Sequence, residues 1–384
     1  MITDELNIVY NVDAITHPLT GIGHYCQQLG LQLQKNPAIH DLRLYSGGQW
    51  PRNFSDLGHS NQWLARARKW IPLKGLALRA YQAKRCRGLE KKFNRFQGYL
   101  LHSPNFILMP FNGPSLTTIH DLSFLHYRQT QPKYRLRFLD REIPKTLAQA
   151  NQIITVSHSV KSELINTYGL TEDQVSVTYL GVDQRFKPLS VTDCQEALNR
   201  FSLNHRQYFL AVATREPRKN LVRLIQAYAG LPDDIKKHHP LVLVGDRGWL
   251  NHRLNQLIKQ QQQHIRLTGY IDQTQLHQLY AAATTTLMPS IYEGFGLPII
   301  ESMACGTPVM TSDVGAMQEV ADGHALLCRP LDVDDIKEKL QWAIDNPEWR
   351  QQAAVNGLNH SQQYTWQRCA EQTIEAYKKA LKAH

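Results

Sequence analysis

Two glutamates with seven residues between them lie in a glycine-rich stretch of the C-terminal half of the chain. Glu293 directly precedes Gly294, and Glu301 lies in a following segment whose apolar residues recur with helical spacing. Glycines let the backbone approach a ligand closely, and the N–H groups at a helix start favour an anion such as phosphate. Carboxylates beside such an anion would chiefly accept hydrogen bonds from sugar hydroxyls. The stretch therefore predicts a site for a nucleotide sugar.

The elements that must position these glutamates are a buried strand, an elbow and a helix. The residues from Thr284 to Met288 form a short apolar run that favours a strand. Pro298 suits the first turn of the helix that follows, and Gly306 suits its end. The helix would bury Ile299, Ile300, Met303 and Ala304. The backbone amides that we expect to face the ligand belong to Gly294, Phe295, Gly296 and Leu297.

Two further candidates lie in the N-terminal half. Gly21 and Gly23 stand between a predicted strand over 6–13 and an apolar-periodic helix, a geometry that suits phosphate, although a plain tight turn is the alternative. His120 ends a predicted strand over 116–120, and ligands gather at the carboxyl ends of strands in open α/β sheets. On position alone, a lone histidine is more often structural.

The glutamate pair belongs to a longer and specific pattern. Residues 289–309 read PSIYEGFGLPIIESMACGTPV. This pattern resembles the Glu-x7-Glu signature of retaining glycosyltransferases of family 4, which have the GT-B fold and use nucleotide diphosphate sugars. An ordinary strand, turn and helix with two solvated glutamates is the alternative. The segments Thr-Gly-Ile-Gly, His-Ser-Pro, Ile-His-Asp-Leu and Glu-Pro-Arg-Lys-Asn are most similar to mannosyltransferases of bacterial surface polysaccharide assembly.

The resemblance implies roles for the candidate residues near the reacting sugar. His120 would reach the transferred sugar, Glu293 would bind and position its hydroxyls, and Glu301 would bind the ribose. The glycine-rich loop with Gly21 and Gly23 would lie against the donor phosphate and the acceptor. The activity implied is transfer of a sugar, from GDP-mannose by this likeness, with retention of the anomeric configuration.

The resemblance also implies how the nucleotide is held. Lys219, with Arg218 second, would contact the diphosphate, and a solvated charge run at a helix start is the alternative. Tyr270 and Ile271 occupy the position that encloses the nucleobase. Since Lys219, Arg218 and the helix-start amides can stabilise the leaving diphosphate, we expect no metal and no other cofactor. The sequence agrees, because it has no convincing Asp-x-Asp and no His/Cys cluster at ligand spacing.

The domain organisation follows from length and from the order of elements. A chain of 384 residues suggests two domains, and strands alternate with helices throughout, which favours parallel, doubly wound sheets. We expect a GT-B, α/β arrangement of two facing Rossmann-like domains. Residues 1–188 would form the acceptor-side domain and residues 189–363 the donor-binding domain. By resemblance, a last helix over 364–381 returns to the first domain.

Composition predicts a cytoplasmic protein. The six cysteines are scattered without Cys-x-x-Cys pairs, so reduced thiols are expected. The first five residues are acidic where a signal peptide would be basic. No stretch approaches the roughly 18 apolar residues that span a bilayer.

The net charge of +10 lies entirely in the first half, where residues 1–190 hold 23 Lys/Arg against 13 Asp/Glu. Within residues 63–96, eleven basic residues accompany the single acid Glu90, and tryptophan and leucine residues are interleaved with them. Such a stretch suits an amphipathic helix on anionic lipid, and a polysaccharide transferase needs a lipid-linked or glycan acceptor. We expect peripheral attachment to the inner face of the membrane. A helix packed on the first domain with solvated bases is the alternative.

Several other function classes remain in view. A GT-B enzyme that uses a UDP-sugar, for glucosyl or N-acetylglucosaminyl transfer or for epimerisation, is one alternative, because nothing in the residues separates guanine from uracil. A glycan phosphorylase would need a Schiff-base lysine for pyridoxal phosphate, and no such signature is apparent. A non-catalytic basic binding protein would suit the pI of 9.2. Nucleic acid is not an expected partner, because no helix-turn-helix, zinc-finger or RNP signature is present.

Overall fold

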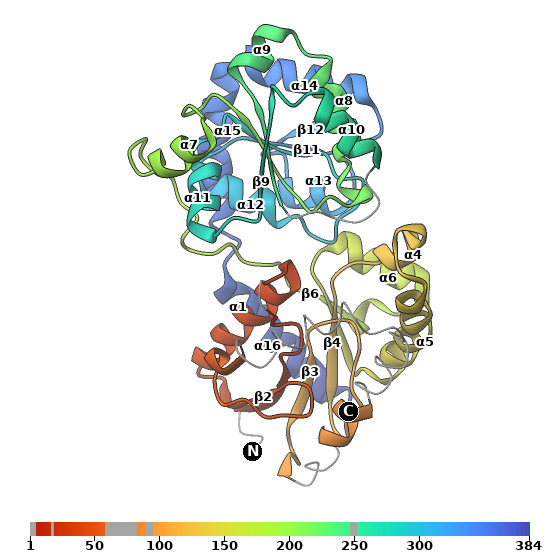
Figure 1. Cartoon of the computed structure of the whole chain (residues 1–384). Helices are drawn as coiled ribbons and strands as arrows, with labels where there is room; N and C mark the ends of the chain where they lie inside the picture. Colours follow the sequence, from red (N-terminus) through yellow and green to blue (C-terminus); the bar gives the residue numbers. More distant parts are fainter. Residues whose placement is uncertain (1–4, 17–18, 58–82, 90–94, 246–251) are drawn as a thin grey trace. The chain divides into compact units, whose positions relative to one another are not determined.

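The computed structural model describes residues 5–16, 19–57, 83–89, 95–245 and 252–384. The chain divides into two compact units (Figure 1). Unit 1 comprises Met1–Leu180 together with Trp366–His384, and unit 2 comprises Gly181–Thr365. The sequence-based boundary near residue 188 lies slightly beyond this division.

Unit 1 is built on a parallel sheet, which has six strands in the part of the chain that the structure describes. The strand order is β2-β1-β3-β4-β5-β6. Successive strands are therefore added on one side of β1 and then on the other, and the strand order reverses between β1 and β3. Such a reversal is the position where open α/β sheets bind ligands, outside the carboxyl ends of the strands. The strands are β1 (Leu6–Asn11), β2 (Ile39–Tyr45), β3 (Leu100–Ser103), β4 (Ser115–Ile119), β5 (Gln152–Thr155) and β6 (Val175–Val177).

Helices bury both faces of this sheet. One cluster of buried residues joins Ile119 and Ile153 of the strands to Leu139 and Leu164 of the helices that follow. The last helix of the chain, α16, packs against α1 and β5, so the C-terminal segment completes unit 1 (Figure 1). The helices are α1 (Gly21–Lys35), η1 (Phe54–Leu57), α4 (Ser123–His126), η3 (Arg128–Thr130), α5 (Lys133–Gln149), α6 (His158–Tyr168), η4 (Glu172–Gln174) and α16 (Trp366–Lys382).

Unit 2 also contains a parallel sheet, again with six strands among the described residues. Read from β9, the order is β9-β8-β7-β10-β11-β12, which is the 3-2-1-4-5-6 order of Rossmann folds. Its reversal point lies between β7 and β10, which are paired neighbours. The strands are β7 (Phe209–Val212), β8 (Leu241–Val244), β9 (Ile265–Gly269), β10 (Thr285–Met288), β11 (Val309–Ser312) and β12 (Leu326–Cys328).

The interior strand β8 shows why this sheet must be covered on both sides. Its residues are all apolar, and they alternate between two buried clusters: Leu241 and Leu243 in one, Val242 and Val244 in the other. Helices α8 and α14 supply the first cluster, and α7 and α11 the second. The helices are α7 (Gln195–Phe201), η5 (Pro217–Lys219), α8 (Leu221–Ala229), α9 (Asp233–His238), α10 (His252–Gln260), α11 (Gln273–Ala282), α12 (Leu297–Ala304), α13 (Gly315–Ala321), α14 (Val333–Asp345) and α15 (Pro347–Ser361).

Two expectations need correction. Gly21 and Gly23 do not form a loop after the first strand: they lie in the first turn of α1, because Thr20 caps that helix and its side chain accepts a hydrogen bond from the Gly23 N–H. Arg85 is not a solvated base of the basic stretch, because its side chain is buried and its Nε lies 2.6 Å from the Asp13 carboxylate. Most of residues 63–96 lies outside the described residues, so the predicted amphipathic helix there stays a prediction.

Two predictions from composition concern the cysteines and the absence of a membrane-spanning stretch. All six cysteines are free, as expected. Among the helices that the structure describes, none combines the length and the apolar character that crossing a membrane requires.

Candidate functional site

The reversal point of the unit 2 sheet brings two loops together, one after β7 and one after β10. The turn η5 follows β7, and the elbow at residues 289–296 follows β10. Asn220 joins them: its backbone is left-handed, its side chain is buried, and its amide donates to the Pro289 carbonyl at 2.9 Å. The Ile291 N–H also donates to the Arg218 carbonyl at 2.8 Å. The two loops therefore form one fixed structure.

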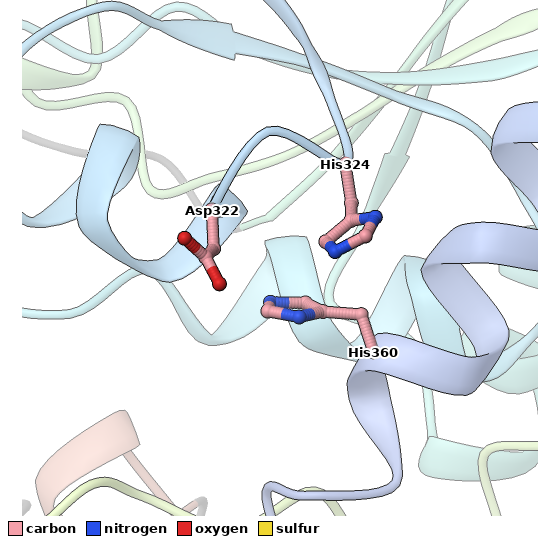
Figure 2. Close-up of side chains that lie close together, drawn as sticks. All are labelled: Asp322, His324 and His360. Atoms are coloured by element: carbon pink, nitrogen blue, oxygen red, sulfur yellow. The ribbon is translucent and has the colours of Figure 1, made fainter.

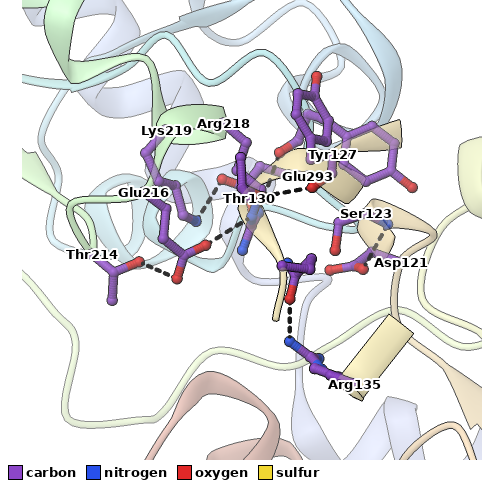
Figure 3. Close-up of polar contacts among 12 residues, drawn as sticks. Asp121, Ser123, Tyr127, Thr130, Arg135, Thr214, Glu216, Arg218, Lys219 and Glu293 are labelled. Carbon is purple, nitrogen blue, oxygen red and sulfur yellow. Dashed lines mark hydrogen bonds and ion pairs between the residues drawn. The ribbon is translucent and has the colours of Figure 1, made fainter. Parts of the chain in front are cut away.

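A cluster of opposite charges lies where these loops meet (Figure 3). Lys219 Nζ donates to Glu293 Oε1 at 2.5 Å, and Arg218 Nη1 donates to Glu293 Oε2 at 2.7 Å. Arg218 also donates through Nε to Glu216 at 3.2 Å. The sequence separately assigned Glu293 to sugar hydroxyls and the two cations to phosphate, and the structure brings all three together.

The cluster keeps Glu293 ionised although the side chain is buried. Desolvation alone would raise the pKa of this carboxyl, but Lys219 and Arg218 more than offset the desolvation and lower the pKa to about 2. A carboxylate held by two cations can only accept hydrogen bonds at neutral pH. A diphosphate bound beside it would share the same two cations.

The elbow continues into α12 as the sequence predicts. Gly296 has φ +104°, and a Cβ there would lie 3.0 Å from the Ile299 side chain, so glycine is the fitting residue. Pro298 lies in the first turn of α12, and no side chain caps the helix at Gly296. The side chains predicted to be apolar and buried in this helix are buried: Ile299, Ile300, Met303 and Ala304.

Glu301 lies one turn into α12, and unlike Glu293 it has no cation to offset its burial. Its Oε2 accepts a hydrogen bond from the buried Tyr280 hydroxyl at 2.9 Å, and no cation is among the groups that influence it. Desolvation raises its pKa to about 7, with a further contribution from the negative charge of Asp183. Glu301 is therefore a carboxyl group whose charge state changes near neutral pH.

The pair predicted to enclose the nucleobase is divided between core and surface. Tyr270 directly follows β9 and is 63% exposed, whereas Ile271 is buried in the cluster that contains Leu279 and Val244. An exposed aromatic ring at the carboxyl end of a strand can stack on a planar base. The buried Ile271 side chain anchors the backbone next to Tyr270 to the core.

In unit 1, His120 lies directly after β4 and is buried. Its Nε2 lies 2.9 Å from the Pro104 carbonyl oxygen, which can only accept, so Nε2 carries the proton and Nδ1 carries the lone pair. Burial lowers the pKa of His120, which favours the neutral ring. His120 therefore presents an acceptor, suited to a hydroxyl group, rather than a donor suited to phosphate.

A buried polar network supports His120, and the sequence alone did not predict it. The Tyr25 ring packs edge-on against His120 at 4.8 Å, and the Tyr25 hydroxyl is hydrogen-bonded to Thr118 at 3.1 Å. His102 joins Thr118, at 3.0 Å, to Tyr377 of α16, at 2.8 Å. Two members of the network lie beside motifs that the sequence shows: Tyr25 follows the Gly21–Gly23 motif, and His102 begins the His-Ser-Pro motif. No sequence motif indicated that α16 would contribute Tyr377 to this network.

Comparison with known families covers both units. Residues 19–186 match the family described as Glycosyltransferase Family 4, and residues 196–360 match Glycosyl transferases group 1. Among curated proteins, the O-antigen chain mannosyltransferase B of Escherichia coli is 35% identical over 381 residues, which is 97% of this chain and 100% of that protein. The O-antigen chain mannosyltransferase RfbU of Salmonella typhimurium is 28% identical, over 64% of each chain.

Solved structures show the same architecture. WaaG, a glycosyltransferase involved in lipopolysaccharide biosynthesis, superposes with a TM-score of 0.73 at 15% identity, over 96% of this chain and 98% of that one. The sucrose-phosphate synthase of Thermosynechococcus elongatus gives a TM-score of 0.70 at 22% identity, over 99% and 100%. At these identities the likeness concerns the fold, and it confirms the predicted GT-B class.

Proposed function

Because this chain belongs to family 4 of the glycosyltransferases, we propose that it transfers mannose from GDP-mannose to a glycan acceptor in the assembly of a cell-surface polysaccharide. The observation that carries the proposal is the 35% identity with an O-antigen chain mannosyltransferase over 97% of this chain. The charged cluster at the reversal point of the unit 2 sheet supplies the matching chemistry. Lys219 and Arg218 would bind the diphosphate, and Glu293 would bind the sugar.

The proposed reaction breaks the bond between the anomeric carbon and the diphosphate oxygen. Negative charge then develops on the leaving diphosphate, and the sugar gains oxocarbenium character. Two cations already fixed by Glu293 need little rearrangement to receive that charge, and one preorganised donor of this kind contributes on the order of 3 kcal/mol. The acceptor hydroxyl oxygen forms the new bond to the anomeric carbon, and its proton passes to the leaving diphosphate. The proposal includes retention of configuration, with no side chain as covalent nucleophile.

The remaining candidate residues have positioning or nucleotide-binding roles in this proposal. Glu301 would accept the ribose hydroxyls, and Tyr270 would stack on the base. His120 would accept a hydrogen bond from a sugar hydroxyl through Nδ1, since its Nε2 proton is engaged by Pro104. We further propose that no metal takes part, because Lys219 and Arg218 supply the positive charge that a metal ion would otherwise supply.

The acceptor is proposed to be lipid-linked, with the enzyme attached at the cytoplasmic face of the membrane through the basic stretch 63–96. Lys84 and Arg87 are exposed, but Arg85 is buried against Asp13 and is excluded from this surface. Binding to anionic liposomes should therefore fall in the Lys84→Gln, Arg87→Gln variant and fall with salt. Equal binding to neutral and anionic liposomes would exclude electrostatic attachment.

A donor panel tests the proposed function. Purified protein is given GDP-mannose, GDP-fucose, UDP-glucose and UDP-N-acetylglucosamine, and release of the nucleoside diphosphate is measured with and without EDTA. We expect GDP-mannose to be used fastest and EDTA to leave the rate unchanged. Glu293→Gln should lower kcat about a hundredfold or more, and Glu301→Gln should chiefly raise the donor KM. Preference for a UDP-sugar would refute the donor assignment, and loss of activity in EDTA that Mg²⁺ restores would refute metal independence.

A further inference from the structure

Three potential metal ligands that are distant in sequence converge in unit 2 (Figure 2). Asp322 directly follows α13, His324 lies between α13 and β12, and His360 lies in the last turn of α15. One ligand atom from each side chain lies within 4.8 Å of the other two. Sequence spacing did not indicate this cluster, because 35 residues lie between His324 and His360.

The backbone around Asp322 explains how the side chains come together. Asp322 and Gly323 both have left-handed conformations, with φ of +41° and +77°. The turn is closed by the His324 N–H, which donates to the Ala321 carbonyl at 2.8 Å. The chain reverses here, and the His324 ring packs on the His360 ring with a centroid distance of 4.4 Å.

Hydrogen bonds to both of its nitrogens hold the ring of His360. Its Nε2 lies 2.8 Å from the Val320 carbonyl oxygen, so Nε2 carries the proton and Nδ1 the lone pair. Histidines that bind metals usually donate their other N–H to a carbonyl or carboxylate in this way. The Nδ1 atom accepts from the side-chain amide of Gln363 at 2.8 Å, and this exposed residue can move away.

We propose that Asp322, His324 and His360 bind one divalent cation of the zinc class. Two imidazole nitrogens and one carboxylate suit Zn²⁺, Ni²⁺ or Co²⁺, whereas Mg²⁺ and Ca²⁺ prefer oxygen ligands alone. Ligand atoms about 2.1 Å from a tetrahedral ion are about 3.4 Å apart, so the cluster must contract slightly. Asp322 is exposed and His324 half-buried, so both side chains can make this movement. A water molecule would complete the coordination.

The cation would stabilise the part of unit 2 that supports the elbow. His360 packs against Tyr364 with a ring distance of 5.2 Å, and Tyr364 packs against Phe295 of the elbow at 5.9 Å. The Tyr364 hydroxyl also donates to the Val320 carbonyl, at 3.4 Å. Holding Asp322 and His324 against α15 would therefore fix the support of Phe295. The cation has no part in the sugar transfer proposed above, and its binding does not depend on that proposal.

Zinc titration of the full chain tests this inference. Protein without a histidine tag is stripped with chelator, and Zn²⁺ is titrated against a chromophoric competitor. We expect one equivalent to bind and to raise Tm, whereas Mg²⁺ at the same concentration should do neither. Asp322→Asn and His324→Ala should each weaken Zn²⁺ binding about tenfold or more. Asparagine tolerates the left-handed backbone at 322, so that variant should stay folded.

His238→Ala is the matched control. His238 also lies beside an aspartate, with Nδ1 3.2 Å from Asp234, but this exposed pair is not part of a three-ligand group among the described residues. Its loss should leave Zn²⁺ binding unchanged. The inference is overturned if wild type binds no Zn²⁺, or if His324→Ala binds it as tightly as wild type, as it would if thiols were the ligands. Transfer activity is not the readout, so failure here leaves the proposed function intact.

Discussion

Glu293 and Glu301 are the same residue type on one elbow and helix, yet their environments shift the pKa in opposite directions. Lys219 and Arg218 hold the pKa of Glu293 at about 2, whereas burial raises that of Glu301 to about 7. The sequence predicted that both carboxylates belong to one site. It could not predict this difference, because Lys219 and Glu293 are 74 residues apart and meet only through the sheet.

The raised pKa of Glu301 predicts that donor binding releases a proton. Burial raises the pKa of this carboxyl to about 7 in the free protein, and ribose hydroxyls that donate to it favour the ionised form. Calorimetric titration with GDP-mannose in two buffers of different ionisation enthalpy measures the release. We expect a fractional proton to be released at pH 7 and affinity to increase from pH 6 to pH 8.

Glu301→Gln is the control for this prediction, because glutamine keeps the size of the side chain and cannot ionise. It should abolish the proton release and flatten the pH dependence of binding. The same raised pKa stabilises the fold below about pH 4.5, a contribution lost as pH rises toward 7. Wild type that releases no proton at pH 7 would show that Glu301 does not meet the ribose.

At the scale of elements, the reversal point of the unit 2 sheet decides where Lys219, Arg218 and Glu293 meet. The alternation of apolar strands and amphipathic helices was sufficient to predict both parallel sheets. The sequence also predicted α12 closely, because Pro298 and Gly306 mark its two ends. The prediction for the start of α1 was wrong. The two glycines suggested a loop, but Thr20 caps the helix and α1 begins at Gly21.

Gly21 and Gly23 differ in the space around them, and this difference yields a matched pair of variants. A Cβ at Gly21 would have no neighbour within 4 Å, whereas a Cβ at Gly23 would lie 3.0 Å from the Ala14 carbonyl oxygen. Gly23→Ala should therefore destabilise the fold by about 1–3 kcal/mol. Gly21→Ala should keep or slightly raise stability, because alanine favours a helix.

The two glycine variants are compared by thermal unfolding and by transfer kinetics. If a ligand approaches the first turn of α1, Gly21→Ala should lower kcat/KM about tenfold or more although the protein is fully folded. Unchanged kinetics in Gly21→Ala would assign this turn a structural role only.

At the scale of the whole molecule, the C-terminal helix α16 belongs to the unit formed by the beginning of the chain. Only the family resemblance predicted this return, because the apolar face of an isolated helix does not reveal its partner. The contact is specific: the Tyr377 hydroxyl is hydrogen-bonded to His102, and the Gln372 side chain accepts from the Tyr179 N–H at 3.1 Å. The network behind His120 therefore depends on the last residues of the chain.

Tyr377→Phe tests that dependence. The change leaves buried His102 without one of its partners, which should cost about 1–3 kcal/mol of unfolding free energy. Denaturant unfolding measures the loss. Tyr134→Phe is the control, because Tyr134 is 41% exposed, and its stability should equal that of wild type. Equal stability of the two variants would mean that the His102 contact contributes nothing.

The measurement that tests the central claim most directly is the affinity for a nucleoside diphosphate. GDP and UDP are titrated into wild type, Lys219→Gln and Lys259→Gln, the last a change on the exposed face of α10 in the same unit. We predict that wild type binds GDP more tightly than UDP, that Lys219→Gln weakens GDP about tenfold or more, and that Lys259→Gln stays within about twofold. Equal GDP affinity for wild type and Lys219→Gln would contradict the assignment of this cluster as the diphosphate site.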